Sequence, residues 1–230
     1  MYLNKKIIAI IPARKNSKGI KNKNLQKLGR NNLVQISVNS AIKSKYIDQI
    51  IVSSDSNKIL ESVNGYKNVL SHIRKKSLSH DKSLIIDVIL DILKIHEYDY
   101  MILLQPTSPF RTTKDIDGIL KETITNKRKS AISLKESNSI PEFMYFIDKS
   151  KKLSPYLKNN QKSTNRQSYK NYYVPNGELY VSDTDFLKKS KKIIHKKTFG
   201  YFSNNHISID IDSMADLELA KALFKINNNI

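Results

Sequence analysis

The chain has 230 residues, of which 39% are hydrophobic, and this is enough for one domain with a substantial core. It contains no cysteine, which excludes disulfides, thiolate metal sites and a cysteine nucleophile. The formal charge of +19 suits a polyanionic ligand, although lysines spread along the whole chain also fit a surface that is merely solvated.

Strands and amphipathic helices alternate along the chain. Apolar runs predict strands at 6–11, 49–53, 68–73, 100–104, 130–134 and 177–181. Apolar residues at helical spacing predict helices around 34–42 and 85–93 and a closing helix over 214–223. This order predicts an α/β fold, a Rossmann-like and mainly parallel sheet with helices on both faces. Ligands of such sheets bind at the carboxyl ends of the strands.

The alternation breaks between residues 136 and 173. There Pro141, Phe143, Tyr145 and Phe146 precede a polar stretch that is rich in lysine and asparagine. We interpret this segment as an arm inserted into a single domain that spans residues 1–230. Such an arm often packs on a second subunit, whereas its composition alone fits a solvated surface excursion equally well.

The segment after the first strand has the composition of a triphosphate site. Small and cationic residues follow the buried strand from Pro12 to Asn24. Arg14, Lys18 and Lys23 are all placed to reach one triphosphate, since arginine offers a fork for phosphate oxygens and lysine a mobile charge. The loop lacks both G-x-x-x-x-G-K-[ST] and G-x-G-x-x-G, so a third kind of nucleotide site is indicated.

Hydrogen-bonding side chains follow the fourth strand. Gln105, Thr107 and Ser108 occur together with two prolines that fix a rigid turn. Such groups at a strand end read a base or a sugar, and Ser108 or Thr112 is at the same time a candidate helix cap. Farther along, Arg166 offers a bidentate contact to a carboxylate, and Asn176 begins an Asn-Gly pair typical of a tight turn.

Two carboxylates near the C-terminus indicate a metal site. We predict a strand over 208–212, on which Asp210 and Asp212 point to the same side, about 6–7 Å apart. Two such carboxylates share a Mg²⁺ that bridges to phosphates, with Mn²⁺ as a substitute. The alternative is a strand end at which Asp212 or Ser213 caps the next helix. Asp81 and Asp87 are poorer candidates, placed like helix-start or helix-surface residues. The five histidines show no metal-ligand spacing, and no Ser/His/Asp order is recognisable.

These motifs resemble those of the acylneuraminate cytidylyltransferases. The similar segments, which follow the family's order, are 11–14, 16–19, 23–25, 52–55, 104–111, 166–167, 176–177 and 210–212. The resemblance implies a fold of the nucleotide-diphospho-sugar transferase type with a dimerisation arm, and therefore a homodimer. It also implies a reaction in which the anomeric hydroxyl of a nonulosonic acid attacks the α-phosphate of CTP, giving a CMP-sugar and pyrophosphate.

The resemblance also implies a role for each matching residue. The nucleotide-binding residues are Ala13, Arg14, Asn16, Ser17, Lys23, Asn24, Arg74 and Ser83. The sugar-binding residues are Gln105, Thr107, Ser108, Arg166, Gln167 and Asn176. Asp210 and Asp212 hold Mg²⁺, and the catalytic set is Arg14, Lys23 and Asp212. In this set the two cations neutralise the triphosphate, and Asp212 assists deprotonation of the attacking hydroxyl.

The chain departs from the family pattern near the sugar. Glu178 follows Asn176-Gly177 where a small residue is expected, and Val174 stands where some members carry a cation. The acid sugar therefore stays open between sialic, legionaminic and pseudaminic acids and Kdo. A further alternative is a glycosyltransferase that uses Asp210-x-Asp212 as a DxD metal site, although the basic first loop suits a triphosphate better.

The positive charge also raises the alternative of a nucleic-acid-binding protein. Base stacking requires aromatic side chains among the cations, and the one such cluster is Tyr169, Tyr172 and Tyr173 beside Lys170. We therefore expect no nucleic-acid partner. The longest apolar runs have the length of a strand and no signal peptide precedes the first of them, so we expect no membrane span and a cytoplasmic location.

Overall fold

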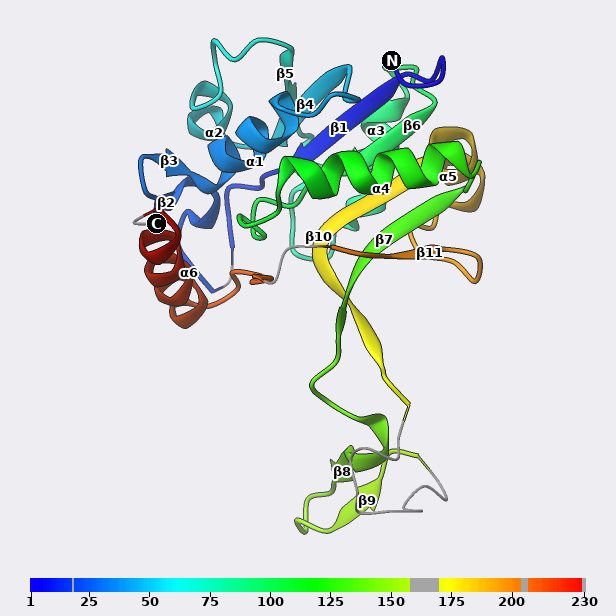
Figure 1. Ribbon diagram of the computed structural model, residues 1–230. Helices are drawn as coiled ribbons and strands as arrows, with labels where there is room; N and C mark the ends of the chain where they lie inside the picture. Colours follow the sequence, from blue (N-terminus) through cyan, green and yellow to red (C-terminus); the bar gives the residue numbers. More distant parts are fainter. Residues whose placement is uncertain (18, 158–169, 204–206, 229–230) are drawn as a thin grey trace.

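A computed structural model describes residues 1–17, 19–157, 170–203 and 207–228 (Figure 1). Its centre is a seven-stranded sheet in the order β11-β7-β10-β6-β1-β4-β5. The strands are β1 Ile7–Pro12, β4 Gln49–Ser54, β5 Val69–Ile73, β6 Tyr100–Leu103, β7 Ser130–Glu136, β10 Tyr173–Asp183 and β11 Phe199–Phe202. Only β10 runs antiparallel to its neighbours in this sheet, β6 and β7, so the predicted mainly parallel sheet is confirmed.

The helices of the described chain are α1 Leu33–Ile42, α2 Asn57–Glu61, α3 Ile85–Leu93, α4 Thr113–Thr125, α5 Thr184–Ser190 and α6 Met214–Asn228. Short 3-10 turns occur at η1 Lys23–Leu25, η2 Lys76–Leu78 and η3 Pro141–Phe143. Two small hairpins pair β2 Lys27–Leu28 with β3 Asn31–Asn32, and β8 Tyr145–Ile147 with β9 Leu153–Pro155. No helix in this part of the chain has the length and apolar character that a membrane span requires.

The central strand β1 is apolar on both faces because helices cover both sides of the sheet. Its residues Ile7, Ala9 and Ile11 pack in one core cluster with α1 and α4, whereas Ile8 and Ile10 pack in a second cluster with α3 and α5. All five side chains are fully buried. Alternate residues of a strand point to opposite faces, so an unbroken apolar run is what a doubly covered strand requires.

A third core cluster attaches α6 to the edge of the molecule. Ile20, Leu28 and Leu33 pack there against Ile211 and Leu217. The segment that follows β1 is thereby held against the segment that precedes α6, although almost 200 residues separate them. This contact brings the predicted triphosphate loop and the predicted metal-binding carboxylates to the same edge of the sheet.

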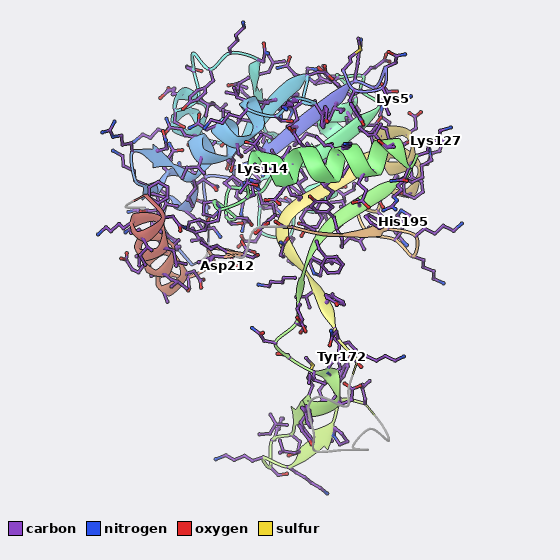
Figure 2. The ribbon with its side chains drawn as sticks, viewed as in Figure 1. Lys5, Lys114, Lys127, Tyr172, His195 and Asp212 are labelled. Atoms are coloured by element: carbon purple, nitrogen blue, oxygen red, sulfur yellow. The ribbon has the colours of Figure 1, made fainter. Side chains whose placement is uncertain are left out.

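The segment interpreted as an arm projects from the body. Beyond the sheet, β7 and β10 continue as a two-stranded ribbon that carries η3 and the β8–β9 hairpin, well below the sheet in Figure 1. Tyr172, labelled on the arm in Figure 2, donates a hydrogen bond from its hydroxyl to Glu142 Oε1 at 2.5 Å. Several apolar side chains of the arm are exposed, including Phe146, Ile147 and Leu153.

Candidate functional site

A cavity of about 610 Å³ opens at the carboxyl ends of β1, β5 and β6. Nine of the predicted site residues line it: Arg14, Ser17, Lys23, Asn24, Arg74, Ser83, Gln105, Thr107 and Asp212. Its wall also contains Gly19, Leu78, His80, Asp81, Ile85 and Val88. The parallel sheet therefore gathers polar groups from distant segments at the edge where such folds bind ligands.

Five other predicted site residues lie elsewhere. Ala13, Asn16, Ser108, Asn176 and Asp210 do not line this cavity, although Ser108 and Asp210 both lie near Gly177. Arg166 and Gln167 lie outside the described residues.

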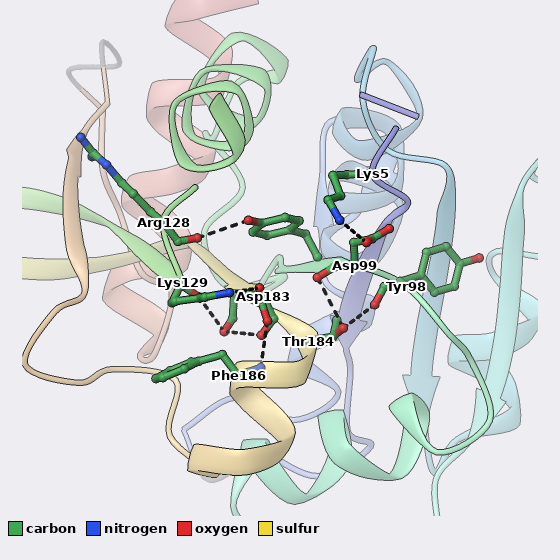
Figure 3. A network of polar contacts seen from close by, with 10 residues as sticks. Lys5, Tyr98, Asp99, Arg128, Lys129, Asp183, Thr184 and Phe186 are labelled. Carbon is green, nitrogen blue, oxygen red and sulfur yellow. Dashed lines mark hydrogen bonds and ion pairs between the residues drawn. The ribbon is translucent and has the colours of Figure 1, made fainter. Parts of the chain in front are cut away.

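A larger cavity, of about 840 Å³, lies at the opposite ends of the strands, where β1 and β6 begin. Charged side chains there already pair with each other: Lys5 with Asp99 and Lys129 with Asp183, each at 2.7 Å (Figure 3). Thr184 closes the network by donating to the carbonyl oxygen of Tyr98. We assign the functional site to the smaller cavity, because it lies at the carboxyl edge and holds the converging cations.

The loop after β1 is fixed by backbone contacts. The Ala13 amide donates to the carbonyl oxygen of Ser53 at 2.9 Å, which extends the β1–β4 pairing by one residue. The buried Asn24 side chain donates from Nδ2 to the carbonyl oxygen of Arg14 at 2.8 Å. These bonds position Arg14 at the cavity, where its Nη1 lies 2.8 Å from Asp81 Oδ1.

Lys23 connects this loop to the segment before α6. Its Nζ donates to the Ile211 carbonyl oxygen at 2.8 Å and to Asp212 Oδ1 at 2.9 Å. The Lys23 side chain is 12% exposed and that of Asp212 is 75% exposed. Gly19 makes the approach possible, because a Cβ there would lie 2.1 Å from the Asp212 carbonyl oxygen.

The predicted strand over 208–212 is wrong, since residues 207–212 belong to no strand. The segment is held instead by the Ile211 amide, which donates to the Thr107 carbonyl oxygen at 2.9 Å, and by the buried Ile211 side chain. Core packing at Ile211 replaces the expected ladder, and both flanking residues, Asp210 and Asp212, are exposed. Among the described residues, no three His, Asp or Glu side chains group as a ready-made metal site.

Arg74 is a rigid part of the cavity wall. Its Nη2 donates to the Ser53 carbonyl oxygen at 2.9 Å and its Nε to Ser53 Oγ at 3.2 Å. The residue is only 7% exposed, and this burial lowers the pKa of its guanidinium. Because its hydrogen bonds to Ser53 already hold the side chain in place, little conformational entropy is lost when a ligand binds.

Arg111 supports the loop that follows β6. It donates from Nη2 to the Gln105 carbonyl oxygen at 2.5 Å and to Ser37 Oγ at 2.7 Å, and from Nη1 to the Glu178 carbonyl oxygen at 2.9 Å. Burial lowers the pKa of Arg111 to about 10, while the nearby Glu178 and Asp210 oppose that shift, so the side chain is charged at neutral pH. A buried cation therefore joins Gln105 to β10.

Asn176 has a structural environment. Its Oδ1 accepts hydrogen bonds from Ser133 Oγ at 2.5 Å and from the Glu178 amide at 3.2 Å. These bonds stabilise the irregular part of β10, where Gly177 has a φ of +81° and the pairing with β7 shifts register. The predicted tight turn at Asn-Gly is therefore a bulge within a long strand.

Sequence reasoning missed Asp81 as part of the site. It was expected near a helix start, but α3 begins only at Ile85 and Asp81 lies in the preceding turn, paired with Arg14. His80 beside it also lines the cavity. Nothing in the local sequence distinguishes this aspartate, because its importance comes from the loop after β1, 67 residues away in the chain.

The arrangement suits a ligand with several negative charges and a polar group at one end. Arg14, Lys23 and Arg74 contribute three cations to one cavity, and Asn24 and Gln105 add amide groups. Cations and polar groups converging at the carboxyl edge of a mainly parallel sheet are typical of nucleotide-binding α/β proteins. The fold and the site thus define a protein of that class.

Comparison with known proteins identifies the family to which the chain belongs. The profile of the family described as Cytidylyltransferase matches residues 8–229, and the chain belongs to this family. It is 31% identical over 217 residues to the N-acylneuraminate cytidylyltransferase of Escherichia coli O18:K1:H7, an alignment that covers 94% of the chain and 51% of the relative. It is 29% identical to the CMP-N,N'-diacetyllegionaminic acid synthase of Legionella pneumophila, with coverage of 96% and 97%.

Solved structures show the same fold. The structure of CMP:2-keto-3-deoxy-manno-octonic acid synthetase complexed with CTP superposes with a TM-score of 0.70 at 15% identity, covering 96% of this chain and 99% of that one. The chain spans about half the length of the Escherichia coli relative. These matches do not favour the glycosyltransferase alternative.

Proposed function

We propose that this protein transfers CMP from CTP to the anomeric hydroxyl of a nonulosonic acid and releases pyrophosphate. The observation that carries the proposal is the convergence of Arg14, Lys23 and Arg74 on one cavity at the carboxyl edge of the sheet. Curated relatives are named for sialic, legionaminic and pseudaminic acids, and all three are acid sugars of this class.

The nucleotide half of the cavity has the charges that the transfer requires. Arg14 and Lys23 neutralise the triphosphate, and Asn24 and Ser17 add polar contacts in the same wall. Arg74 and Ser83 line the same cavity and would hold the cytosine. Phosphoryl-type transfer depends mainly on an in-line nucleophile and on charge neutralisation, so the protein needs no covalent intermediate.

Asp210 and Asp212 would hold Mg²⁺, with Mn²⁺ as a substitute. Both carboxylates are exposed, and Asp212 opens on the cavity, which fits the oxygen ligands that Mg²⁺ prefers. The bound ion would supply positive charge at the phosphates. Asp212 would also accept the proton of the attacking hydroxyl, directly or through water.

The acceptor half is formed around the loop after β6. Gln105 and Thr107 line the cavity and would contact the sugar; Ser108 and Asn176, predicted to share this role, are buried and do not line the cavity. Among the described residues, the buried hydroxyls of Thr107 and Ser108 have no hydrogen-bond partner. The Thr107 hydroxyl, on a residue that lines the cavity, suits a polyhydroxylated ligand, and Arg166 and Gln167 would complete the contacts to it.

We further propose that the protein is a homodimer formed through its arm and acts in the cytoplasm, where CTP is made and used. Phe146, Ile147 and Leu153 are exposed by 59%, 65% and 60% on a narrow projection. A second copy that covers them would remove apolar surface from water.

The test is pyrophosphate release from CTP and Mg²⁺ with sialic, legionaminic and pseudaminic acids and Kdo offered in parallel. UTP and ATP serve as controls for the base. Release that requires CTP and one of these acids would support the proposal and name the substrate. Absence of release with every acid, together with absence of CTP binding, would refute it.

A further inference from the structure

Ser53, His72 and Asp91 form a line of buried polar side chains next to Arg74. Arg74 Nε donates to Ser53 Oγ at 3.2 Å, and Ser53 Oγ lies 3.0 Å from His72 Nδ1. On the far side of the imidazole, His72 Nε2 is 3.7 Å from Asp91 Oδ2. Ser53 is fully buried, and the side chains of His72 and Asp91 are only 12% and 9% exposed. The line connects α3 to the cavity wall through β5 and β4.

The chemistry of these groups favours one direction for each hydrogen bond. A guanidinium has donors only, so Ser53 Oγ must accept from Arg74. The hydroxyl has one proton left to give, and the group within reach of it is His72 Nδ1. The tautomer that gives this proton an acceptor has Nδ1 unprotonated and the ring proton on Nε2, facing Asp91. The neutral imidazole completes the network.

A protonated imidazole would disrupt the same line. His72 would then donate from both ring nitrogens, and Ser53 Oγ would face two donors while its own proton lost its acceptor. The ring would also place a second positive charge next to the guanidinium, in a buried region where charge repulsion is poorly screened. The position of Arg74 is thus coupled to the protonation of a residue that does not line the cavity.

We propose that His72 is a positioning residue for nucleotide binding: its neutral form holds Ser53, and through it Arg74, in the binding orientation, and its protonation weakens that hold. The choice of CTP as the nucleotide rests on the function proposed above. The Ser53–His72–Asp91 arrangement is not a nucleophilic triad, because Ser53 is fully buried and its Oγ is occupied by Arg74.

The charges around the ring agree with a neutral His72. Burial is the main cause that lowers its pKa below the ordinary 6.5, and Arg74, Lys75 and His96 act in the same direction. Asp91 on α3 raises the pKa, but Lys75 Nζ already pairs with this carboxylate at 2.7 Å. The ring should therefore be neutral at physiological pH and take up a proton in the acidic range.

The test measures CTP affinity by calorimetry without acid sugar, from about pH 5 to pH 8. His72→Asn keeps an acceptor near Nδ1 but cannot titrate, whereas His72→Leu removes the acceptor. The control is His195→Leu, since His195 also contacts a serine, Ser130 at 2.8 Å, but no residue of the cavity. Titration of the CTP phosphates is common to all variants and cancels in the comparison.

We expect wild type to lose affinity relative to His72→Asn as the pH falls below 6.5. At about pH 7.5, His72→Leu should bind CTP about tenfold more weakly, the effect of one lost hydrogen bond to a charged network. His195→Leu should bind like wild type. Identical pH profiles of wild type and His72→Asn, or undiminished binding by His72→Leu, would overturn the proposal.

A second measurement needs no variant and no nucleotide. Nitrogen-15 NMR of the wild-type imidazole at about pH 7.5 should show a proton on Nε2 of His72 and none on Nδ1. A proton on Nδ1 would overturn the inference even where a variant fails to fold. Absence of CTP binding by wild type at every pH would instead refute the proposed function, and the NMR result would still decide the role of His72.

Discussion

Lys23 Nζ lies 2.9 Å from Asp212 Oδ1, so a cation and a carboxylate that the proposed reaction uses for different purposes are paired with each other. The lysine side chain is nearly buried, and the carboxylate is exposed. A triphosphate would compete with Asp212 for Lys23 and free the carboxylate to face a metal ion. Binding of CTP would therefore also make the Asp212 carboxylate available to the metal ion.

Substitution of either partner should separate binding from turnover. We expect Lys23→Met to weaken CTP binding at least about tenfold, because a nearly buried contact to phosphate is lost. Asp212→Asn should retain CTP binding without metal and lose Mg²⁺-dependent turnover. Calorimetry and pyrophosphate release measure the two effects, with Lys27→Met, an exposed lysine on β2, as control. Full activity of Asp212→Asn at saturating Mg²⁺ would exclude its role.

Arg111 should act on the acceptor rather than on the nucleotide. In Arg111→Lys, the fork that joins the Gln105 and Glu178 carbonyl oxygens is lost, although a positive charge remains. We expect a larger increase in KM for the acid sugar than for CTP, and a lower melting temperature. The control is Arg128→Lys. Arg128 is partly exposed, and its Nη1 lies 3.5 Å from Glu122 Oε1. Equal increases in both KM values would argue against a role in positioning Gln105.

Alanine at Gly177 can be compared with alanine at Gly65, because the two glycines have nearly the same positive φ. Gly177 and Gly65 have φ values of +81° and +84°, so alanine is strained to a similar degree at both, by roughly 1–2 kcal/mol. A Cβ at 177 would lie 3.3 Å from Asp210 Oδ2 and 3.4 Å from Ser108 Oγ, whereas one at 65 meets nothing within 4 Å. We expect similar losses of unfolding free energy, but reduced kcat only in Gly177→Ala. Equal activities of Gly177→Ala and Gly65→Ala would show that a Cβ close to Asp210 and Ser108 does not affect catalysis.

The sequence predicted the parallel core well, because β1 and its neighbours are buried on both faces and therefore read as apolar runs. It failed at 208–212, where the alternation of Ile209 and Ile211 with polar residues resembled a strand. That pattern comes from packing against α6 and not from pairing with another strand. Alternation reports burial on one side of an extended chain and cannot show whether a partner strand exists.

Long-range contacts in the site were also beyond sequence reasoning. Arg14 and Lys23 were found because they follow a buried strand, but the partner of Arg14, Asp81, is set by how the loop after β5 folds back. The Ser53–His72–Asp91 line was missed for the same reason. It joins β4, β5 and α3, whose side-by-side placement depends on sheet order rather than on any local motif.

Acid should destabilise the protein through His72. Because the pKa of His72 in the folded state is below 6.5, the unfolded chain binds the proton first as the pH falls. The free energy of unfolding should therefore decrease as the pH drops from 6.5 toward the folded pKa. Urea denaturation at several pH values measures this loss, which should be smaller in His72→Asn. An equal loss of unfolding free energy in both proteins would mean that folding does not lower the pKa of His72.

The arm can be tested with two exposed isoleucines. Ile147 on the arm and Ile95 after α3 are exposed by 65% and 70%, respectively. If the arm forms the dimer interface, Ile147→Asp should shift the protein toward monomers because a charge would be buried there, and Ile95→Asp should not. Analytical ultracentrifugation measures the shift. A wild-type monomer, or a dimer that tolerates Ile147→Asp, would contradict an interface at this position.

The most direct test of the proposed transfer follows the α-phosphate of CTP. CTP labelled at that phosphate is incubated with Mg²⁺ and the preferred acid sugar, and the products are separated. The label should move into a CMP-sugar only when the acid is present, while a label at the γ-phosphate should appear in pyrophosphate. Label that remains in CTP, or appears as free CMP whether or not the acid is present, would contradict a cytidylyl transfer at this site.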